Sequence, residues 1–489
     1  MTPQVAIVLA LAIPVAGAIG IAACHRAPNL RESVTLAAAA GMFGVVLTLV
    51  GPVLEGSRPA LFVLEALPGI GIAFRVEPLG MLFALVASAL WIVNSIYSIG
   101  YMRGNKEQHQ TRFYVCFALA LACTLGIAFA GNLLTLFLFY EGLTLVTYPL
   151  VTHHGDDEAR RGGRVYLGVL LTTSIVFLLT AIVATWAVAG TIDFAPGGIL
   201  GDAGLSNAAI GGLLALYMFG IGKAALMPFH RWLPAAMVAP TPVSALLHAV
   251  AVVKAGVFAV VKVIVYVFGP ELLAGVRAAD WLPVVAGFTI LAASVVALRS
   301  DNLKRRLAYS TVSQLSYVVL AASLLVPLSI AAAALHIAAH AVGKITLFFA
   351  AGAIYTASHK TEVSQLDGIG RRMPWTMAAF AVGALSLIGV PPAAGFLSKW
   401  MMFQGAALAH HYVAIAVLAA STLLNAAYFL PIVYAAFFRA PPAGEPAHGE
   451  APVAAVVALM ITAAATLALP FFVQVPLALA RALAGIGPN

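Results

Sequence analysis

The stretch Gly220–Lys262, GIGKAALMPFHRWLPAAMVAPTPVSALLHAVAVVKAGVFAVVK, decides how this chain folds. It is apolar enough to lie in lipid, yet four prolines interrupt it and it carries several lysines and histidines. A proline removes one amide donor and clashes with the preceding helical turn. Broken backbone at membrane depth persists only where protein buries it or where it lines a hydrated cavity. Because a charge inside a bilayer costs roughly 2.5–3.5 kcal/mol on insertion scales, this stretch indicates an ion path. Its cations and imidazoles are Lys223, His230, His248, Lys254 and Lys262.

The whole composition agrees with a membrane location. Of 489 residues, 62% are hydrophobic and 9% are charged, whereas soluble domains are about 25% charged. The sequence therefore predicts an all-α polytopic membrane protein. Its net charge of +8 is spread over short loops, which argues against nucleic-acid binding.

The three cysteines lie in or beside apolar runs and lack metal-ligand spacing. The N-terminal apolar run lacks the basic start of a cleaved signal peptide, so we expect this run to be the first span.

Apolar runs of about 20 residues predict membrane spans. About fourteen are expected, with the seventh and the twelfth broken. The runs are 5–23, 33–53, 79–99, 112–130, 132–151, 165–188, 207–227, 242–268, 281–298, 309–326, 327–355, 374–408, 412–438 and 451–482.

The loop charges give an orientation. Of the 26 Lys and Arg residues, 17 fall in the loops that join odd to even spans, 4 fall in the other loops, and 5 fall inside spans. Cytoplasmic loops carry the excess of Lys and Arg, so both termini are predicted on the outer side. The five inside spans are Lys223, Lys254, Lys262, Lys344 and Lys399.

One acid, Glu141, falls in the middle of a span. In a low-dielectric bundle a lysine can release a proton near neutrality, and a nearby carboxylate holds that proton. Glu141 and Lys223 could therefore form a proton or cation switch, although a structural salt bridge is the alternative.

Two histidines and a lysine share one helix face. His336, His340 and Lys344 are spaced i, i+4 and i+8, which makes a stripe. Histidine titrates near physiological pH, so this stripe is a candidate proton relay. Metal binding and simple core packing are alternatives, and no metal site is predicted. His248 and Lys254 do not share a face and would continue a path.

Other polar residues have plainer interpretations. His230, beside the break, is either a proton entry point or an anchor. We expect Lys262 to snorkel to the interface and His153 and His154 to lie in a solvated loop. The Pro- and Gly-rich stretch 439–450 is expected to be a flexible cytoplasmic loop.

The two predicted breaks carry similar features. Lys223 precedes Pro228 in one, and Lys399 follows Pro391 and Pro392 in the other. Interrupted segments at corresponding places in two halves indicate inverted repeats with ion sites at the breaks.

Several motifs together resemble the antiporter-like membrane subunits of respiratory complex I, membrane-bound hydrogenases and Mrp-type Na⁺/H⁺ antiporters. These motifs are FYEGLTLVTYPLVTH, GKAALMPFHRWLPAAMVAPTPVSALLHA, DNLKRRLAYSTVSQLSY, HIAAHAVGKITLFFAAG and GVPPAAGFLSKW. The resemblance implies fourteen spans with two inverted five-helix repeats. It divides the chain into 1–111 (helices 1–3), 112–268 (first repeat), 269–438 (second repeat) and 439–489 (a cytoplasmic loop and the last span). It also implies roles for Glu141 (fifth-helix glutamate), Lys223 (seventh-helix lysine), Lys254 (eighth-helix connecting lysine), Lys399 (twelfth-helix terminal lysine), and the central histidines His248, His336 and His340.

The predicted function is a proton-translocating subunit of a multi-subunit complex in a bacterial inner membrane. Its partners would be other membrane subunits, H⁺ and in one alternative Na⁺. The sequence predicts no cofactor in this chain, so any NADH:quinone oxidoreductase or hydrogenase chemistry would lie in partners. The alternatives are a D-type subunit of an Mrp Na⁺/H⁺ antiporter, which the length and Lys399 resemble, a solute carrier, a silent scaffold, or a subunit that couples ion flow to inorganic-carbon uptake.

Overall fold

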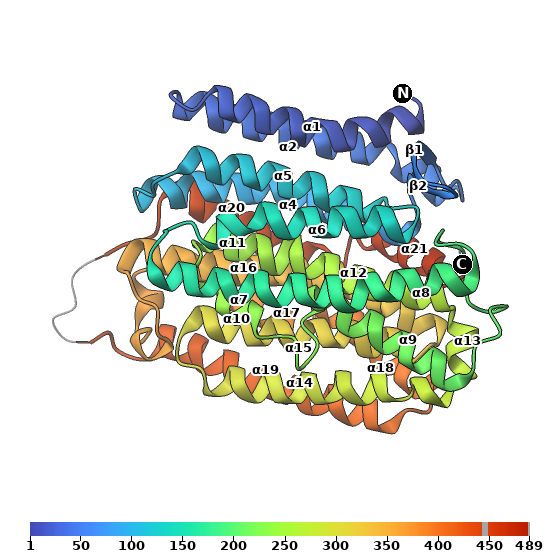
Figure 1. Cartoon of the computed structure of the whole chain (residues 1–489). Coiled ribbons are helices and arrows are strands. Elements are labelled where there is room, and N and C mark those ends of the chain that lie inside the picture. Colours follow the sequence, from blue (N-terminus) through green and yellow to red (C-terminus); the bar gives the residue numbers. More distant parts are fainter. Residues whose placement is uncertain (443–447, 488–489) are drawn as a thin grey trace.

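The computed structural model describes residues 1–442 and 448–487. Long helices run roughly parallel or antiparallel to one another and pack into one bundle, with both chain ends on the same side (Figure 1). The α-helices are α1 Pro3–Ala23, α2 Pro28–Thr48, α3 Val50–Leu54, α4 Pro78–Gly104, α5 Gln110–Ala128, α6 Leu133–Val151, α7 Asp157–Thr172, α8 Leu179–Ala189, α9 Asn207–Gly220, α10 Trp232–Ala235, α11 Thr241–Ala245, α12 Val252–Val263, α13 Pro270–Ala274, α14 Trp281–Arg299, α15 Leu303–Ser323, α16 Pro327–Ser358, α17 Pro374–Ile388, α18 Ala394–Leu408, α19 Tyr412–Phe438, α20 Val453–Ala468 and α21 Gln474–Leu483.

The described residues include 10 helical segments long and apolar enough to cross a membrane. Shorter apolar helices, α9, α17 and α20, occupy three further predicted runs. The predominantly helical membrane architecture is therefore confirmed. Part of the loop predicted at 439–450 lies outside the described residues.

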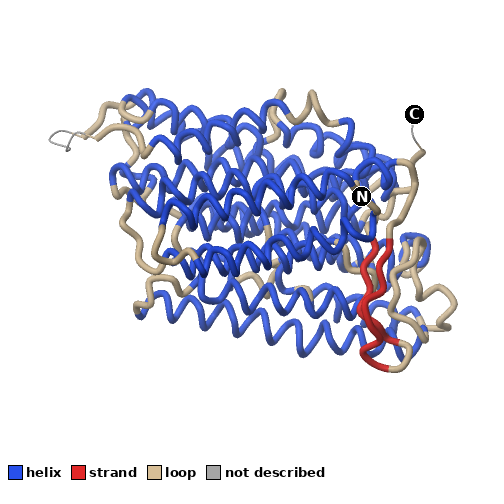
Figure 2. The backbone as a smooth tube through the Cα atoms, turned by 90° about the horizontal axis from the view of Figure 1, so that it is seen from above, coloured by secondary structure: helices blue, strands red, loops and turns tan. Residues whose placement is uncertain are grey.

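A β-hairpin interrupts the helical pattern and was not predicted. Strands β1 (Ala60–Leu67) and β2 (Ile70–Arg75) pair antiparallel, and the hairpin projects at the end of the bundle that carries the N-terminus (Figure 2). Part of the signal was present in the sequence, because the turn residues Pro68 and Gly69 separate an apolar run at 60–67 from the alternating Ile70, Ile72 and Phe74. The all-α expectation was wrong at this point.

Both predicted breaks are present. Helix α9 ends at Gly220, a single 3-10 turn follows at Gly222–Ala224, and Ala225 takes the left-handed conformation with φ +55°. Helix α17 ends at Ile388, Gly389 follows with φ +95°, and α18 begins only at Ala394. Prolines stop a helix because they lack an amide hydrogen, and each break lies within a few residues of one.

Two segments form the centre of the bundle. The segment Thr241–Phe268 is 100% buried over its most apolar window, and Pro327–Ser358 is 94% buried. The first comprises α11, the π-helical turn Leu246–Val250, α12 and a second π-helical turn, Ile264–Phe268; the second is α16. The other candidate spans leave a third or more of their windows exposed. The lysines and histidines of these two segments therefore face protein rather than lipid.

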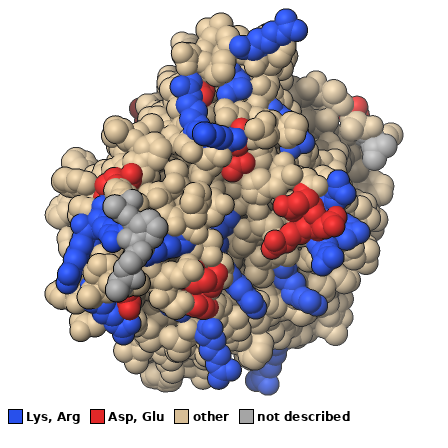
Figure 3. All heavy atoms as spheres, turned by 90° about the vertical axis from the view of Figure 1, so that its left-hand side faces the viewer, with Lys and Arg blue, Asp and Glu red and all other residues tan. Residues whose placement is uncertain are grey.

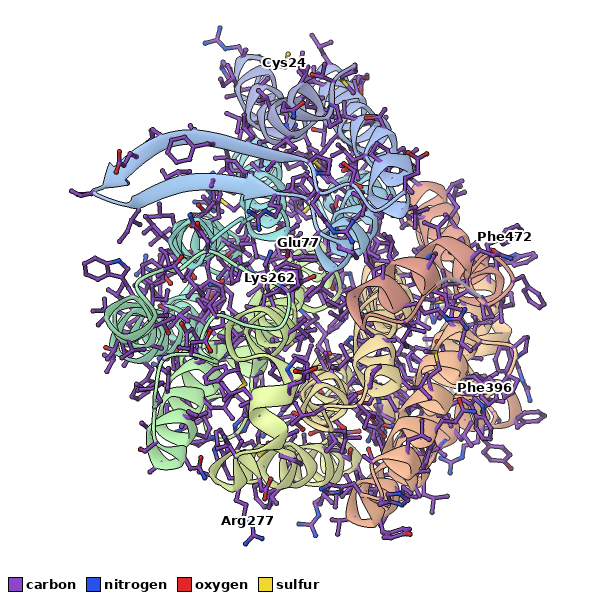
Figure 4. All side chains as sticks on the ribbon, turned by 90° about the vertical axis from the view of Figure 1, so that its right-hand side faces the viewer. Cys24, Glu77, Lys262, Arg277, Phe396 and Phe472 are labelled. Atoms are coloured by element: carbon purple, nitrogen blue, oxygen red, sulfur yellow. The ribbon has the colours of Figure 1, made fainter. Side chains whose placement is uncertain are left out.

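Positive side chains gather at one end of the bundle. Figure 3 shows the end opposite the two termini, where several groups of Lys and Arg surround smaller groups of Asp and Glu. Arg277 lies at the other end, as Figure 4 shows. This distribution matches the charge bias of the loops.

Gly256 of α12, in the central segment, allows the backbone of the first break to pack directly against it because it has no side chain. A Cβ atom here would lie 2.3 Å from Ala224 N and from Lys223 C. Those are backbone atoms, so the break would have to move. We expect Gly256→Ala to destabilise the fold by about 1–3 kcal/mol and to displace Lys223. The measurement is the apparent Tm in detergent. The control is Gly212→Ala, where a Cβ meets nothing within 4 Å; an unchanged Tm in Gly256→Ala would contradict this packing.

Candidate functional site

Lys223 is fully buried in the 3-10 turn of the first break. Its ammonium donates to the Tyr140 carbonyl oxygen at 2.8 Å and to Thr144 Oγ1 at 2.5 Å. The Tyr140 hydroxyl accepts the backbone N–H of Lys223 at 3.0 Å, and the Tyr140 ring centroid is 3.3 Å from Lys223 Nζ. Helix α6 therefore holds both the backbone and the charge of this lysine.

Glu141 lies on the helix that holds Lys223, but the two side chains do not form an ion pair. Among the described residues, no carboxylate oxygen lies within 4.0 Å of Lys223 Nζ. The ammonium contacts Tyr140, the neighbour of Glu141, and the carboxylate acts on it electrostatically from beyond hydrogen-bond distance. Glu141 Oε1 is buried and has no hydrogen-bond partner in the described structure. The structure thus places the two groups apart.

Lys254 and the two stripe histidines form the middle of the site. Lys254 Nζ is hydrogen-bonded to His340 Nδ1, and the His340 ring stacks on the His336 ring with centroids 5.9 Å apart and planes at 11°. His336 Nδ1 is 2.8 Å from Ser398 Oγ, and His336 Nε2 is 3.1 Å from Gln314 Oε1. Both ring nitrogens of His336 are therefore hydrogen-bonded to neutral side chains. These residues connect α12, α16, α15 and α18.

Lys344 does not extend that stripe; it begins a second polar row. Its ammonium donates to Ser310 Oγ at 2.9 Å. The Tyr428 hydroxyl lies 3.1 Å from the same oxygen and is also hydrogen-bonded to Asn425 Oδ1. Asn425 Nδ2 in turn donates to the Leu387 carbonyl at 3.5 Å. This row therefore runs from α16 through α15 and α19 to the end of α17.

Both rows reach the second break, where Lys399 lies. Its ammonium donates to the carbonyls of Leu387 at 2.7 Å and Ile388 at 3.1 Å. These carbonyls belong to the last turn of α17, which has no intrahelical donors for them, and a cation is favourable at that end of a helix dipole. Lys399 follows directly after Ser398, the partner of His336. The break thus joins the histidine row to the Lys344 row.

Two predicted residues are not hydrogen-bonded into these rows. His248 lies in the first π-helical turn, and its ring packs on Phe348 with centroids 4.8 Å apart. His230 lies beyond the break, with its ring 6.1 Å from that of Tyr309. Among the described residues, no hydrogen bond joins Lys223 to Lys254 either.

Several buried polar atoms along the rows have no partner within the described protein. They are Glu141 Oε1, both ring nitrogens of His248, Gln314 Nε2 and His340 Nε2. Buried polar groups in native proteins are almost always satisfied, and internal water is the usual partner when protein is not.

The sequence prediction missed the neutral residues that link the charged ones. Ser310, Gln314 and Tyr317 recur at helical spacing along α15, and a polar stripe on an otherwise apolar helix is a recognisable signal. Tyr317 stacks on His336 with centroids 5.9 Å apart, and its ring lies 4.8 Å from Lys399 Nζ. No three His, Cys, Asp or Glu side chains of the described chain cluster as metal ligands.

The prediction that Lys262 snorkels to the interface was wrong. Its side chain is fully buried, and its ammonium is 3.0 Å from Glu77 Oε2. The reason is that the Ala130 carbonyl of the loop before α6 and the rings of Phe194, Phe258 and Tyr266 surround the ammonium, so an ion pair replaces contact with water.

His153 and His154 do not form a freely solvated pair. His153 is buried with Nε2 3.8 Å from Glu107 Oε2, whereas His154 Nε2 is 3.4 Å from the same oxygen and its side chain is 39% exposed. Hydrogen bonding to Glu107 raises the pKa of His154, and burial lowers the pKa of His153 to about 4. The loop before α7 is therefore fastened to the loop before α5.

This pair predicts a pH dependence. A raised pKa means that the His154–Glu107 contact stabilises the fold below about pH 6.5, the ordinary pKa of histidine, and that this stabilisation is lost as the pH rises through the folded-state pKa. We expect His154→Gln to lower the apparent Tm at pH 6 by an amount corresponding to less than about 1 kcal/mol, with a smaller change at pH 8. Exposed His25→Gln is the control, and equal shifts at both pH values would contradict the assignment.

Comparison with known proteins identifies relatives of this chain. The sequence model of a family described as NADH:quinone oxidoreductase/Mrp antiporter, transmembrane, matches residues 130–425. The A/B component of a probable K⁺/H⁺ antiporter of Rhizobium meliloti is 33% identical over 78% of this chain and 38% of its own length. The N component of NADH-quinone oxidoreductase of Desulforudis audaxviator is 33% identical over 87% of this chain and 84% of its own length. The L component of the same kind of enzyme in Mycobacterium tuberculosis is 32% identical, and the chain spans 63% of it.

The fold is shared with solved membrane complexes. A chain of the Mrp complex from Dietzia sp. superposes with a TM-score of 0.87 and 23% identity, covering 99% of this chain and 97% of that one. A chain of an archaeal membrane-bound sulfane sulfur reductase superposes with a TM-score of 0.86 over the same shares. The expected family resemblance is confirmed. This chain belongs to the NADH:quinone oxidoreductase/Mrp antiporter transmembrane family.

Proposed function

We propose that the chain is a proton-translocating subunit of a multi-subunit membrane complex. One observation carries this proposal: Lys254, His340 and His336 lie in the two most enclosed segments of the bundle, where a hydrogen bond and ring stacking join them, rather than facing lipid. Ionisable residues inside a membrane are expensive and mark ion pathways. The family relatives, named as subunits of antiporters and quinone oxidoreductases, support it.

The proposed route starts at the first break. Lys223 holds a proton under the electrostatic control of Glu141, and His230 is the candidate entry point. The proton then passes to Lys254 and His340, with His248 on the flank of this step. A neutral histidine can accept a proton at one ring nitrogen and release one from the other, and His336 has a hydrogen-bond partner at each of its ring nitrogens, Ser398 and Gln314.

The route ends at the second break. Lys399 receives the proton from the side of Ser398. Lys344 influences the protonation of Lys399 through Ser310 and the Tyr428 hydroxyl. Within the described residues Lys399 donates to two carbonyl oxygens and forms no ion pair, so its amine can lose and regain a proton without breaking one.

The finer architecture is part of the proposal. It comprises fourteen spans, with helices 1–3 in 1–111, inverted five-helix repeats in 112–268 and 269–438, and a last span in 439–489. The end that is rich in Lys and Arg faces the cytoplasm of a bacterium, and the chain lies in the inner membrane. Redox cofactors, where the complex uses them, belong to partner chains.

A second candidate is an Mrp-type subunit that exchanges Na⁺ for H⁺. The similarity to a chain of a solved Mrp complex favours this candidate. So does the similarity to the A component of the Na⁺/H⁺ antiporter of Alkalihalophilus pseudofirmus, at 31% identity.

Co-purification after mild detergent extraction distinguishes the candidates. Dehydrogenase or hydrogenase chains in the purified complex would support a redox-driven pump, and exclusively small hydrophobic chains would support the antiporter. A chain that purifies alone and takes up organic solutes would contradict both.

A further inference from the structure

The Glu77–Lys262 pair lies apart from the proposed route. Glu77 directly precedes α4, and Lys262 lies near the end of α12; both are buried, with 3% and 0% of their surfaces exposed. Figure 4 looks onto the end of the bundle that carries the termini and shows these two side chains pointing toward each other beneath the hairpin. Replacing a buried ion pair by apolar residues is often neutral or stabilising, so stability alone gives this pair no evident purpose.

The ammonium of Lys262 is held by groups that suit any monovalent cation. Glu77 Oε2 is 3.0 Å away and the Ala130 carbonyl oxygen is 2.8 Å away. The ring centroid of Phe194 is 4.4 Å away, and those of Phe258 and Tyr266 follow at 5.6 Å and 5.8 Å. Carboxylate and carbonyl oxygens are the ligands of hard cations, and aromatic faces attract cations without regard to their chemistry.

The carbonyl of this site comes from backbone that lies outside the helices. Ala130 lies in the loop between α5, which ends at Ala128, and α6, which begins at Leu133. Its carbonyl oxygen is thus outside the helical hydrogen-bond ladder. Unwound carbonyls at helix ends are the groups that coordinate Na⁺ in membrane transporters.

A route from outside reaches the carboxylate. Glu77 lines a cavity of about 680 Å³ at this end of the bundle, together with Tyr266, Arg58, Arg75 and Glu271. Lys262 does not belong to the described residues that line this cavity, whereas its ion-pair partner Glu77 does. A small hydrated cation in the cavity would meet the carboxylate first, whereas the ammonium already occupies its inner side.

We propose that Glu77 and the Ala130 carbonyl form a binding site for a monovalent alkali cation, Na⁺ or K⁺, in which the Lys262 ammonium is the built-in competitor. When Lys262 is protonated, its ammonium fills the site. When Lys262 gives up its proton, the amine becomes neutral and the cation takes its place beside Glu77. One positive charge leaves as H⁺ and one enters as Na⁺ or K⁺, so the charge of the site is conserved. The inference rests on the proposed function as an ion-moving subunit.

Thermal stability of the purified full chain provides the test, because a cation that binds only the folded protein stabilises it by mass action. In Lys262→Met the ammonium that competes with the cation for the Glu77 carboxylate is absent. We expect its apparent Tm to rise by several degrees when choline chloride is replaced by NaCl or KCl at equal ionic strength. The wild-type protein should show a much smaller rise.

The double variant Lys262→Met, Glu77→Gln is the matched control, since it keeps the shape of the pair and removes both charges. Its apparent Tm should be the same in the three salts. An equal Tm of Lys262→Met in all three salts would overturn the proposal, and so would a double variant that responds as strongly as the single one. This readout involves no proton flux, so its failure leaves the proposed function standing, and the failure of proton translocation would be seen separately.

Discussion

Replacing Lys223 by methionine is expected to lower proton translocation by about 10²-fold or more, the usual contribution of a positioned proton-transfer group. Methionine keeps the apolar stem that packs in the break and removes only the ammonium, which donates to the Tyr140 carbonyl and Thr144 Oγ1. The chain should therefore still fold and assemble. The measurement is the formation of a pH gradient by sealed vesicles that contain the assembled complex.

A lysine at the surface provides the control for that variant. Lys106 lies in the exposed loop between α4 and α5, so Lys106→Met changes the same residue types without touching the bundle. Its vesicles should keep the full rate. Normal translocation by assembled Lys223→Met would remove this residue from the route.

Replacing Lys254 by methionine is the second large effect we expect, also about 10²-fold or more. Lys254 is the amine that contacts the histidine row, through His340 Nδ1. Without it, the stacked rings of His340 and His336 have no donor on the side of α12, although Lys223 and Lys399 remain in place. The loss should appear in the rate of proton translocation and leave assembly unchanged.

A variant one helical turn away separates the chemistry from packing. Phe258 lies on the same helix, is equally buried and bears no titratable group. Phe258→Leu should lower the apparent Tm while retaining most of the translocation rate. If Phe258→Leu abolished translocation as completely as Lys254→Met, the effect of the lysine variant would be one of packing.

The helical architecture could be predicted because an apolar run of about 20 residues by itself indicates a membrane-spanning helix. The predicted run 412–438 and helix α19 share the same bounds, and the breaks followed from Pro228 and from the pair at 391–392. The hairpin at 60–75 was missed because its first strand is a nearly continuous apolar run, and only the Pro-Gly turn and the alternating second strand indicate strands.

The residue types of the candidate site could also be predicted, since Lys, His and Glu are rare in apolar runs. Their pairing could not. Lys262 and Glu77 meet only because the end of α12 packs under the start of α4, and Lys344 turns to Ser310 rather than along the histidine stripe. Helical spacing places residues on one face but does not say which neighbouring helix that face meets.

The full enclosure of two segments could be predicted only in part. Their lysines and histidines indicate that the charged face avoids lipid, but the apolar residues of a span do not tell whether protein or lipid surrounds the rest of the helix. That Thr241–Phe268 and Pro327–Ser358 are enclosed is a result of packing among the other helices. This enclosure is what turns scattered lysines and histidines into one buried system.

The most direct measurement is the proton flux of vesicles that carry Lys223→Met, Lys254→Met or both replacements together. Two groups that act in one series route give strongly non-additive losses. The account predicts that the double variant retains the same small residual flux as either single variant. A double variant whose loss equals the product of the two single losses, or a Lys254→Met variant with normal flux, would contradict a single proton route through the buried lysines.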